Sequence, residues 1–190
     1  MKNSFITIVS GLPRSGTSMM MKMLEAGGMA VVTDNLRTAD EDNPKGYYEF
    51  ERVKQIESDK DWLPGAQGKA VKMISELLKH LPPNYQYRVV FMRRKIEETL
   101  ASQKQMLVRR GQPTDVVSNE KLAELFRRHL ERTFAWLEEQ SNFAVLFVEY
   151  ADVLQNVAAQ AGRINEFLDK TLNVEKMIGV VDQTLYRQRK

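Results

Sequence analysis

Cysteine is absent from this chain of 190 residues. Its absence excludes a disulfide framework and a cysteine-based zinc site, and it is typical of proteins in a reducing compartment. Long hydrophobic runs are also absent, since no apolar stretch approaches the roughly 20 residues that span a bilayer. The run "FITIV" at 5–9 is too short for the core of a signal peptide. We therefore expect a single domain over 1–190 that lies in the cytoplasm and binds no membrane.

A large net charge is a third absence. The formal charge is +3, and acidic and basic residues are mixed along the chain. A solvated surface is one interpretation of the basic residues. The other is a set of clusters around an anionic ligand, at "MRR" (92–94), "VRR" (108–110) and "YRQRK" (186–190). No dense basic face interleaved with aromatic residues is found, so we do not expect nucleic-acid binding.

Short apolar runs alternate with helical patterns along the chain. The runs have the continuous hydrophobic character of strands buried on both faces, and they lie at 5–9, 30–33, 69–74, 87–92 and 143–149. Helical patterns lie at 17–26, 75–80, 95–110 and 119–140. Asp152 is expected to cap a further helix. This alternation predicts an α/β fold of three layers, with a mostly parallel central sheet flanked by helices.

The stretch "FITIVSGLPRSGTS" at 5–18 runs from a predicted strand through a glycine-rich turn into a predicted helix. Such a turn presents backbone N–H groups and the N-terminus of the helix to a phosphate group. Gly11 and Gly16 have the spacing of the phosphate-binding P-loop, but Thr17 stands where nucleotide triphosphatases carry lysine. A tight strand-to-helix turn with an incidental arginine, Arg14, is the alternative interpretation.

The absence of the P-loop lysine at position 17 bears on which group the protein could transfer. ATPases and GTPases need it, together with a hydroxyl and an acidic residue on Mg²⁺, to offset the charge of the β- and γ-phosphates. The predicted strand "VVFM" ends in Arg93 and Arg94 rather than in an acidic residue. A sulfuryl group carries less charge than a phosphoryl group, so its transfer depends less on a metal ion to offset that charge. We therefore expect no metal ion.

Three segments, in order, resemble those of the PAPS-dependent sulfotransferases, a family of the P-loop superfamily. "SGLPRSGTS" is similar to the family's 5′-phosphosulfate-binding loop, and "RVVFMRRKIEETLASQ" is similar to its 3′-phosphate-binding strand and helix. "VLFVEYADVLQN…RINEFL" is similar to a strand that ends in Tyr-x-Asp and to a helix that ends in "FL". The resemblance covers most of the chain. It implies a P-loop fold and the transfer of a sulfuryl group from PAPS to a hydroxyl or amine, with PAP as the product.

The resemblance also implies roles for individual residues. Arg14 would stabilise the leaving phosphate, while Arg94 and Ser102 would bind the 3′-phosphate. A planar guanidinium suits a phosphate better than an ammonium group does. The 5′-phosphate would be held by backbone and hydroxyl groups of Ser15, Gly16, Thr17 and Ser18.

Two residues are candidates for the general base. Glu49, in "NPKGYYEFE", falls in the segment after the first helix, where the Golgi-type branch with a PRSGTT loop uses a glutamate. A solvated loop carboxylate is the alternative interpretation of Glu49. The cytosolic branch uses a histidine just after a strand, and His80, in "KHLP", is superficially similar to it. Lys72 is expected to assist near the sulfuryl group.

The acceptor site is expected to be built from the polar loops 34–50 and 108–118. Aromatic residues that could line it, or that pin the loop to the core, are Tyr47, Tyr48, Phe50 and Trp62. The larger cytosolic enzymes end in a basic segment that covers the 3′-phosphate. Arg187 and Arg189 are candidate substitutes for it here, with Arg109 and Arg110 as alternatives, and a frayed basic tail is the ordinary interpretation.

The leading hypothesis is therefore a small PAPS-dependent sulfotransferase. Its expected partners are the nucleotide donor and a small-molecule acceptor that the sequence does not identify, and a homodimer is compatible with the sequence. The first rival is a P-loop kinase for a nucleoside or another small molecule. The second is a degenerate nucleotide-binding domain without catalytic activity.

Overall fold

The computed structural model describes residues 5–34, 48–114 and 116–182. Its centre is a five-stranded parallel sheet in the order β2-β3-β1-β4-β5. The strands are β1 (Phe5–Gly11), β2 (Val31–Val32), β3 (Ala70–Lys72), β4 (Gln86–Arg93) and β5 (Phe143–Glu149). The predicted α/β fold with a parallel central sheet is confirmed, and each of these strands overlaps a predicted run.

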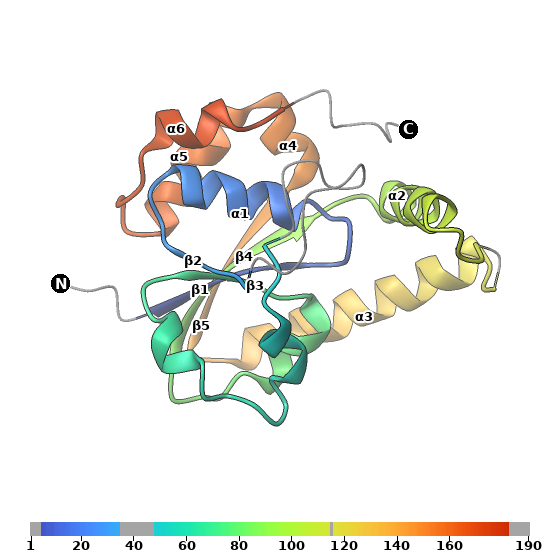
Figure 1. The fold of residues 1–190 in the computed structure, drawn as a ribbon, viewed down its shortest axis with the longest axis horizontal. Helices are drawn as coiled ribbons and strands as arrows, with labels where there is room; N and C mark the ends of the chain where they lie inside the picture. Colours follow the sequence, from blue (N-terminus) through green and yellow to red (C-terminus); the bar gives the residue numbers. More distant parts are fainter. Residues whose placement is uncertain (1–4, 35–47, 115, 183–190) are drawn as a thin grey trace.

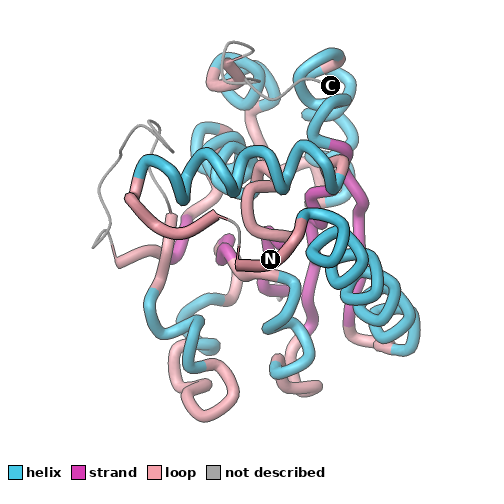
Figure 2. Tube along the Cα trace, turned by 90° about the vertical axis from the view of Figure 1, so that its right-hand side faces the viewer, coloured by secondary structure: helices cyan, strands magenta, loops and turns pink. Residues whose placement is uncertain are grey.

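Helices cover both faces of the sheet, as Figure 1 and Figure 2 show. One face carries α1 (Thr17–Ala26), α4 (Tyr150–Gln155), α5 (Val157–Phe167) and α6 (Val174–Gly179). The other face carries α3 (Asn119–Glu139) and the 3-10 helices η1 (Glu51–Gln55), η2 (Leu63–Ala66) and η3 (Ser75–His80). α2 (Ile96–Arg109) lies beyond the carboxyl end of β4 and packs beside α3 (Figure 1). The three predicted layers are present.

β1 lies at the centre of the sheet because its side chains are buried on both faces. Ile6 and Ile8 pack with the residues of α3 and the 3-10 helices, while Phe5 and Val9 pack on the side of α1. A parallel strand between two helical layers requires such a continuous apolar sequence. Because β1 pairs with both β3 and β4, the residues that follow these three strands meet at one edge of the sheet.

Two helical regions differ in how well the sequence predicts them. The amphipathic pattern at 119–140 is observed as α3, and Ser118 caps this helix by accepting a hydrogen bond from the backbone N–H of Lys121 (3.3 Å). The capping role predicted for Asp152 is wrong. Asp152 lies in the first turn of α4, because the helix starts directly after β5 and has Glu149 as its N-cap residue.

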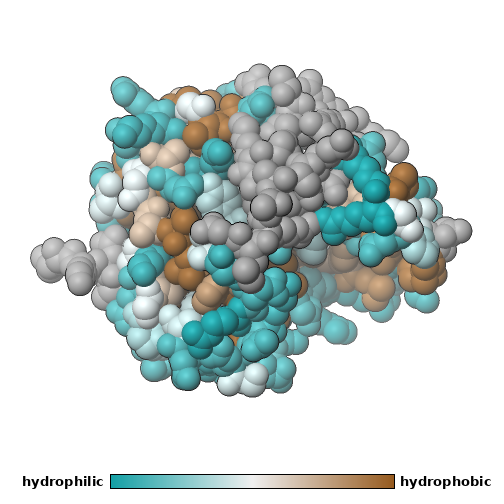
Figure 3. Space-filling view, viewed as in Figure 1, coloured by the Kyte–Doolittle hydropathy of each residue, from teal (hydrophilic) through white to brown (hydrophobic). Residues whose placement is uncertain are grey.

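Hydrophobic side chains are exposed where α2 and α3 extend beyond the sheet. Val108, Val116 and Leu125 are 61%, 80% and 50% exposed. Figure 3 shows brown atoms at the right-hand end of the molecule, where these helices lie. Among the helices of the described ranges, none combines the length and the apolar character needed to cross a membrane.

Candidate functional site

The glycine-rich turn between β1 and α1 adopts backbone conformations that its sequence explains. Gly11 has φ 146° and Gly16 has φ 101°, values that glycine tolerates and other residues rarely adopt. A Cβ atom at Gly11 would lie 2.5 Å from the carbonyl oxygen of Met92, and one at Gly16 would lie 2.5 Å from the ring of Tyr150. Both glycines are therefore required by close packing against β4 and α4 as well as by the turn.

Arg14 sits in the left-handed region at φ 68°, which is unusual for a residue with a side chain. Its Nε donates a hydrogen bond to the hydroxyl of Ser102 on α2 (3.2 Å). Its carbonyl oxygen accepts a hydrogen bond from the guanidinium of Arg94 (3.1 Å). The structure thus brings together the three residues that the resemblance assigns to the two phosphates of the donor.

Arg94 is itself held by a buried ion pair. Its Nε lies 3.1 Å from a carboxylate oxygen of Glu98, and the two side chains are only 8% and 3% exposed. The guanidinium also stacks over the ring of Tyr150, 4.5 Å from the centroid. Burial raises the pKa of Tyr150, which therefore stays neutral. Arg94 is fixed on several sides and braces the strained residue Arg14.

The buried hydroxyl of Ser15 suits this turn to an anionic ligand. Ser15 is 1% exposed, and its Oγ has no hydrogen-bond partner among the described residues. Buried polar groups in native proteins are nearly always satisfied. α1 begins at Thr17 directly after Gly16, so the N-terminus of this helix opens onto the same turn. An anion bound here would meet both the hydroxyl and the positive end of the helix dipole.

Lys72 connects the turn to the second candidate region. Its Nζ donates a hydrogen bond to the hydroxyl of Ser18 (3.3 Å) and lies 3.8 Å from a carboxylate oxygen of Glu49. The two members of the Lys72–Glu49 pair are 14% and 25% exposed, so the pair is shielded from bulk solvent. The proposed base and the proposed assisting lysine are therefore neighbours, and the lysine also contacts the first turn of α1.

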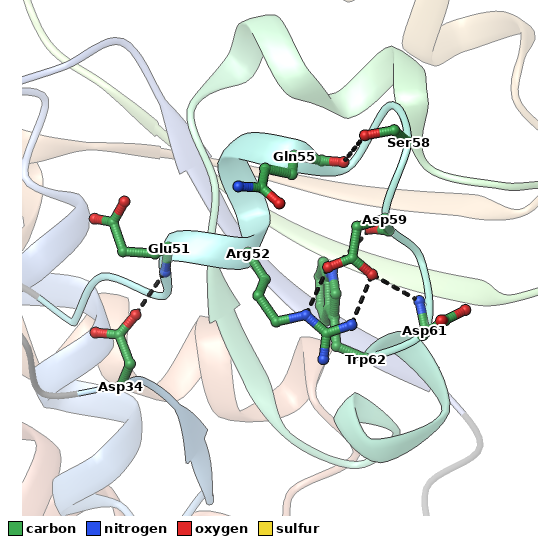
Figure 4. Close-up of polar contacts among 8 residues, drawn as sticks. All are labelled: Asp34, Glu51, Arg52, Gln55, Ser58, Asp59, Asp61 and Trp62. Atoms are coloured by element: carbon green, nitrogen blue, oxygen red, sulfur yellow. Dashed lines mark hydrogen bonds and ion pairs between the residues drawn. The ribbon is translucent and has the colours of Figure 1, made fainter.

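The backbone of Glu49 is fixed to the end of β2. Its carbonyl oxygen accepts hydrogen bonds from the hydroxyl of Thr33 (3.0 Å) and from the backbone N–H of Asp34 (3.2 Å). The carboxylate of Asp34 accepts a hydrogen bond from the backbone N–H of Glu51 (2.6 Å), as Figure 4 shows. These bonds fix the backbone at Glu49, whose carboxylate lies 3.8 Å from Lys72 Nζ.

The segment that follows Glu49 is braced on the protein surface. Arg52 makes two hydrogen bonds of 2.6 Å to the carboxylate of Asp59 (Figure 4). Trp62 is buried and packs edge-to-face on Phe50, with the ring centroids 5.6 Å apart. The two aromatic rings therefore attach this segment to the core, which is the structural interpretation given for them above.

The remaining candidates lie elsewhere or outside the described part of the chain. His80 is at the end of η3, and Arg109 and Arg110 are exposed at the end of α2. The candidates that fall outside the described residues are Tyr47, Arg187 and Arg189.

Sequence reasoning missed two residues that complete the site. Glu98 follows Arg94 by one helical turn, and this spacing is a recognisable signal for an ion pair. Tyr150 belongs to the quoted segment "VLFVEYAD", but nothing in the sequence indicates that its ring packs on both Gly16 and Arg94.

Comparison with known proteins identifies the family. The sequence model of the sulfotransferase domain matches residues 6–190. This chain belongs to the sulfotransferase family. The match includes the glycine-rich turn, Lys72, Arg94 and Ser102, so the site described above lies within the family's domain. No match was found among the curated proteins.

Solved structures agree with this sulfotransferase assignment at the level of the fold. Mouse sulfotransferase SULT7A1, complexed with PAP, matches with a TM-score of 0.51 and 15% identity, over 98% of this chain and 64% of that one. The sulfotransferase domain from the curacin biosynthetic pathway matches with a TM-score of 0.51 and 11% identity, over 89% of this chain and 75% of that one. The chain thus spans just under two thirds of the length of the mouse protein.

Proposed function

We propose that this chain transfers a sulfuryl group from PAPS to a hydroxyl or amine of a small-molecule acceptor and releases PAP. The observation that carries the proposal is the convergence of Arg14, Ser102 and Arg94 beside the buried, unpartnered hydroxyl of Ser15. Two cationic side chains and a helix N-terminus at one turn favour an anionic ligand with more than one charged group. Membership of the sulfotransferase family supports PAPS as that ligand.

The residues at the turn fit such a donor in the following way. Ser15, Gly16, Thr17 and Ser18 would offer backbone N–H and hydroxyl groups to its 5′-phosphate. Arg94 and Ser102 would bind the 3′-phosphate from β4 and α2, and Arg187 and Arg189 remain proposals for covering it. The unsatisfied oxygen of Ser15 supports this fit, because a phosphate at the turn gives its hydroxyl a strong acceptor.

The chemistry asked of the protein is an in-line displacement at sulfur. A bond forms between the acceptor oxygen or nitrogen and sulfur, while the bond from sulfur to the bridging oxygen of PAP breaks. Negative charge develops on that bridging oxygen, and we assign its stabilisation to Arg14. We assign a second positive charge near the sulfuryl group to Lys72, and its contact with the first turn of α1 supports this role. Glu49 is the proposed acceptor of the proton.

Binding of PAP is the first experiment. Thermal unfolding is followed with PAP, PAPS, ADP or ATP–Mg²⁺, each added separately. We expect PAP at one hundred times its dissociation constant to stabilise the fold by about 2.7 kcal/mol, and ADP to do much less. Stabilisation by ATP–Mg²⁺ alone would favour the kinase, and stabilisation by none of the four would favour a domain that has lost its nucleotide.

Glu49→Gln tests the assignment of the base. We expect the transfer rate at saturating PAPS to fall by about 100-fold, a typical value for the loss of a general base. The KM for PAPS should change little, because the carboxylate of Glu49 faces Lys72. Glu51→Gln is the matched control, since its side chain is exposed and pairs with Lys54. A Glu49→Gln variant with the parent rate would remove Glu49 from the mechanism.

Three broader expectations also stay proposals. The absence of cysteine supports a cytoplasmic location, and the family match from 6 to 190 supports a single domain. The exposed hydrophobic residues of α2 and α3 support a homodimer. Sedimentation at several protein concentrations tests the homodimer directly.

A further inference from the structure

A serine, a histidine and a glutamate form a hydrogen-bonded chain outside the site described so far. Ser75 begins η3, shortly after β3, and His129 lies in the middle of α3. The Ser75 hydroxyl oxygen is 2.7 Å from Nε2 of His129. Nδ1 of the same imidazole is 3.1 Å from a carboxylate oxygen of Glu76. A histidine thus links a hydroxyl on one side to a carboxylate on the other.

The chemistry of the two outer groups sets the direction of the hydrogen bonds. An ionised carboxylate can only accept hydrogen bonds. Nδ1 of His129 therefore carries a proton and donates a hydrogen bond to Glu76. With one proton on the ring, Nε2 holds a lone pair, and the Ser75 hydroxyl donates a hydrogen bond to it. A hydrogen bond from Lys79 lowers the pKa of Glu76 and keeps this carboxylate ionised at neutral pH. Both hydrogen bonds of this serine–histidine–glutamate chain therefore point from the serine toward the glutamate.

The cluster lies at the protein surface, with the serine at its inner end. Ser75 is 4% exposed, whereas the side chains of His129 and Glu76 are 23% and 58% exposed. Ile74, which precedes the serine, is 45% exposed and presents an apolar surface beside it. Thr133 offers a second hydroxyl to Nε2 of His129, but at 3.5 Å. Ser75 is thus the closer partner of the imidazole.

We propose that Ser75 is an activated nucleophile that accepts acyl or phosphonyl groups from electrophilic esters. A nucleophile bonded to a base, and a base oriented by a third group, are the geometric requirements for such activation. In the covalent step, a bond forms between Ser75 Oγ and the carbonyl carbon or phosphorus, and the bond to the leaving group breaks. The Ser75 proton moves to Nε2 of His129, Glu76 stabilises the imidazolium, and the leaving group departs with the electron pair.

A simpler role for the Ser75–His129–Glu76 hydrogen bonds would be to attach η3 to α3. A Ser75–His129 hydrogen bond alone achieves this, and the orienting carboxylate adds nothing to it. His129→Gln separates the two roles, because a glutamine side chain accepts a hydrogen bond from the Ser75 hydroxyl but does not take its proton. A purely structural hydrogen bond between η3 and α3 is kept in this variant, whereas the reactivity of an activated Ser75 is lost.

A fluorophosphonate probe, with the adduct located by mass spectrometry, tests the proposal. In this reaction the P–F bond breaks, fluoride leaves and a Ser75 Oγ–P bond forms. We expect the parent protein to be labelled at Ser75, Ser75→Ala to give no such adduct, and both His129→Gln and His129→Leu to be labelled about 100-fold more slowly. Glu76→Gln should slow labelling by about tenfold, as expected for a group that orients the base.

Two internal controls make the result decisive. Exposed Ser58, which donates a hydrogen bond to the backbone of Gln55, reports the background reactivity of an ordinary serine. The chain has only two histidines, so nitrogen NMR resolves His129 from His80 and reads which nitrogen of His129 is protonated. Labelling of Ser75 no faster than Ser58, or parent-like labelling of His129→Gln, would overturn the proposal. Stabilisation by PAP is measured on the same samples, so failure here is distinct from failure of the proposed function.

Discussion

Arg14→Ala is expected to lower the transfer rate by about 100- to 1000-fold, the usual loss when one group that stabilises developing charge is removed. PAP binding should weaken by only about tenfold, the value of a single charge-assisted hydrogen bond. The difference arises because the backbone of the turn, Ser15 and Arg94 still hold the nucleotide in the variant. Steady-state kinetics with PAPS, together with titration of PAP, measure the two effects separately.

Two further variants sharpen this test. Arg14→Lys keeps the positive charge but loses the planar fork, so it should recover part of the rate. Arg163→Ala is the matched control, because Arg163 lies on α5 and donates a hydrogen bond to Gln160 of the same helix. If Arg14→Ala bound PAP much more weakly but kept the parent rate at saturation, Arg14 would serve binding rather than the displacement.

Arg94→Ala is expected to reduce both stability and nucleotide binding. The substitution removes the guanidinium that lies 3.1 Å from the carboxylate of Glu98, whose side chain is 3% exposed. Breaking a buried ion pair in this way costs about 3–5 kcal/mol of unfolding free energy. It also frees the carbonyl of Arg14 from its hydrogen bond, so PAP should bind at least about tenfold more weakly. Denaturant unfolding and PAP titration are the measurements.

The double variant Arg94→Ala, Glu98→Gln separates these two losses. Removing the negative charge of Glu98 should restore much of the stability, because the buried charge that faced Arg94 is then gone as well. PAP binding should stay weak, because the guanidinium is still missing. Glu98→Gln alone keeps Arg94 and should lose less stability than Arg94→Ala. Recovery of PAP binding in the double variant would contradict a direct role for Arg94 at the nucleotide.

The sequence predicts the central strands well because burial on both faces leaves a clear signal. β1 is buried along its whole length, and most of β4 is buried too. α6 has no comparable signal. It is only six residues long, and of these only Met177 is buried. Short helices are stabilised by the surface on which they pack rather than by their own periodicity.

The site is predictable where a local pattern carries it. The glycine spacing and the run from Arg94 to Ser102 are read directly from the chain, since a turn and a helix fix their geometry. The hydrogen bond between Arg14 and Ser102 is not, because it depends on β1 pairing with β4. The contact between His129 and Ser75 joins α3 to η3, and it too is visible only in the fold.

The pairing of β1 with β4 also has a consequence for biosynthesis. Arg14 and Ser102 are 88 positions apart. Translation adds roughly 5–20 residues per second, so Ser102 is synthesised roughly 4–18 s after Arg14. Until residues 86–93 are made, the apolar β1 lacks its neighbour β4, and until residues 70–72 are made it lacks β3 as well. Parallel pairing between such distant segments is slow in any case. We expect a nascent chain that ends before β4 to need a chaperone, and PAP to protect only chains that include α2.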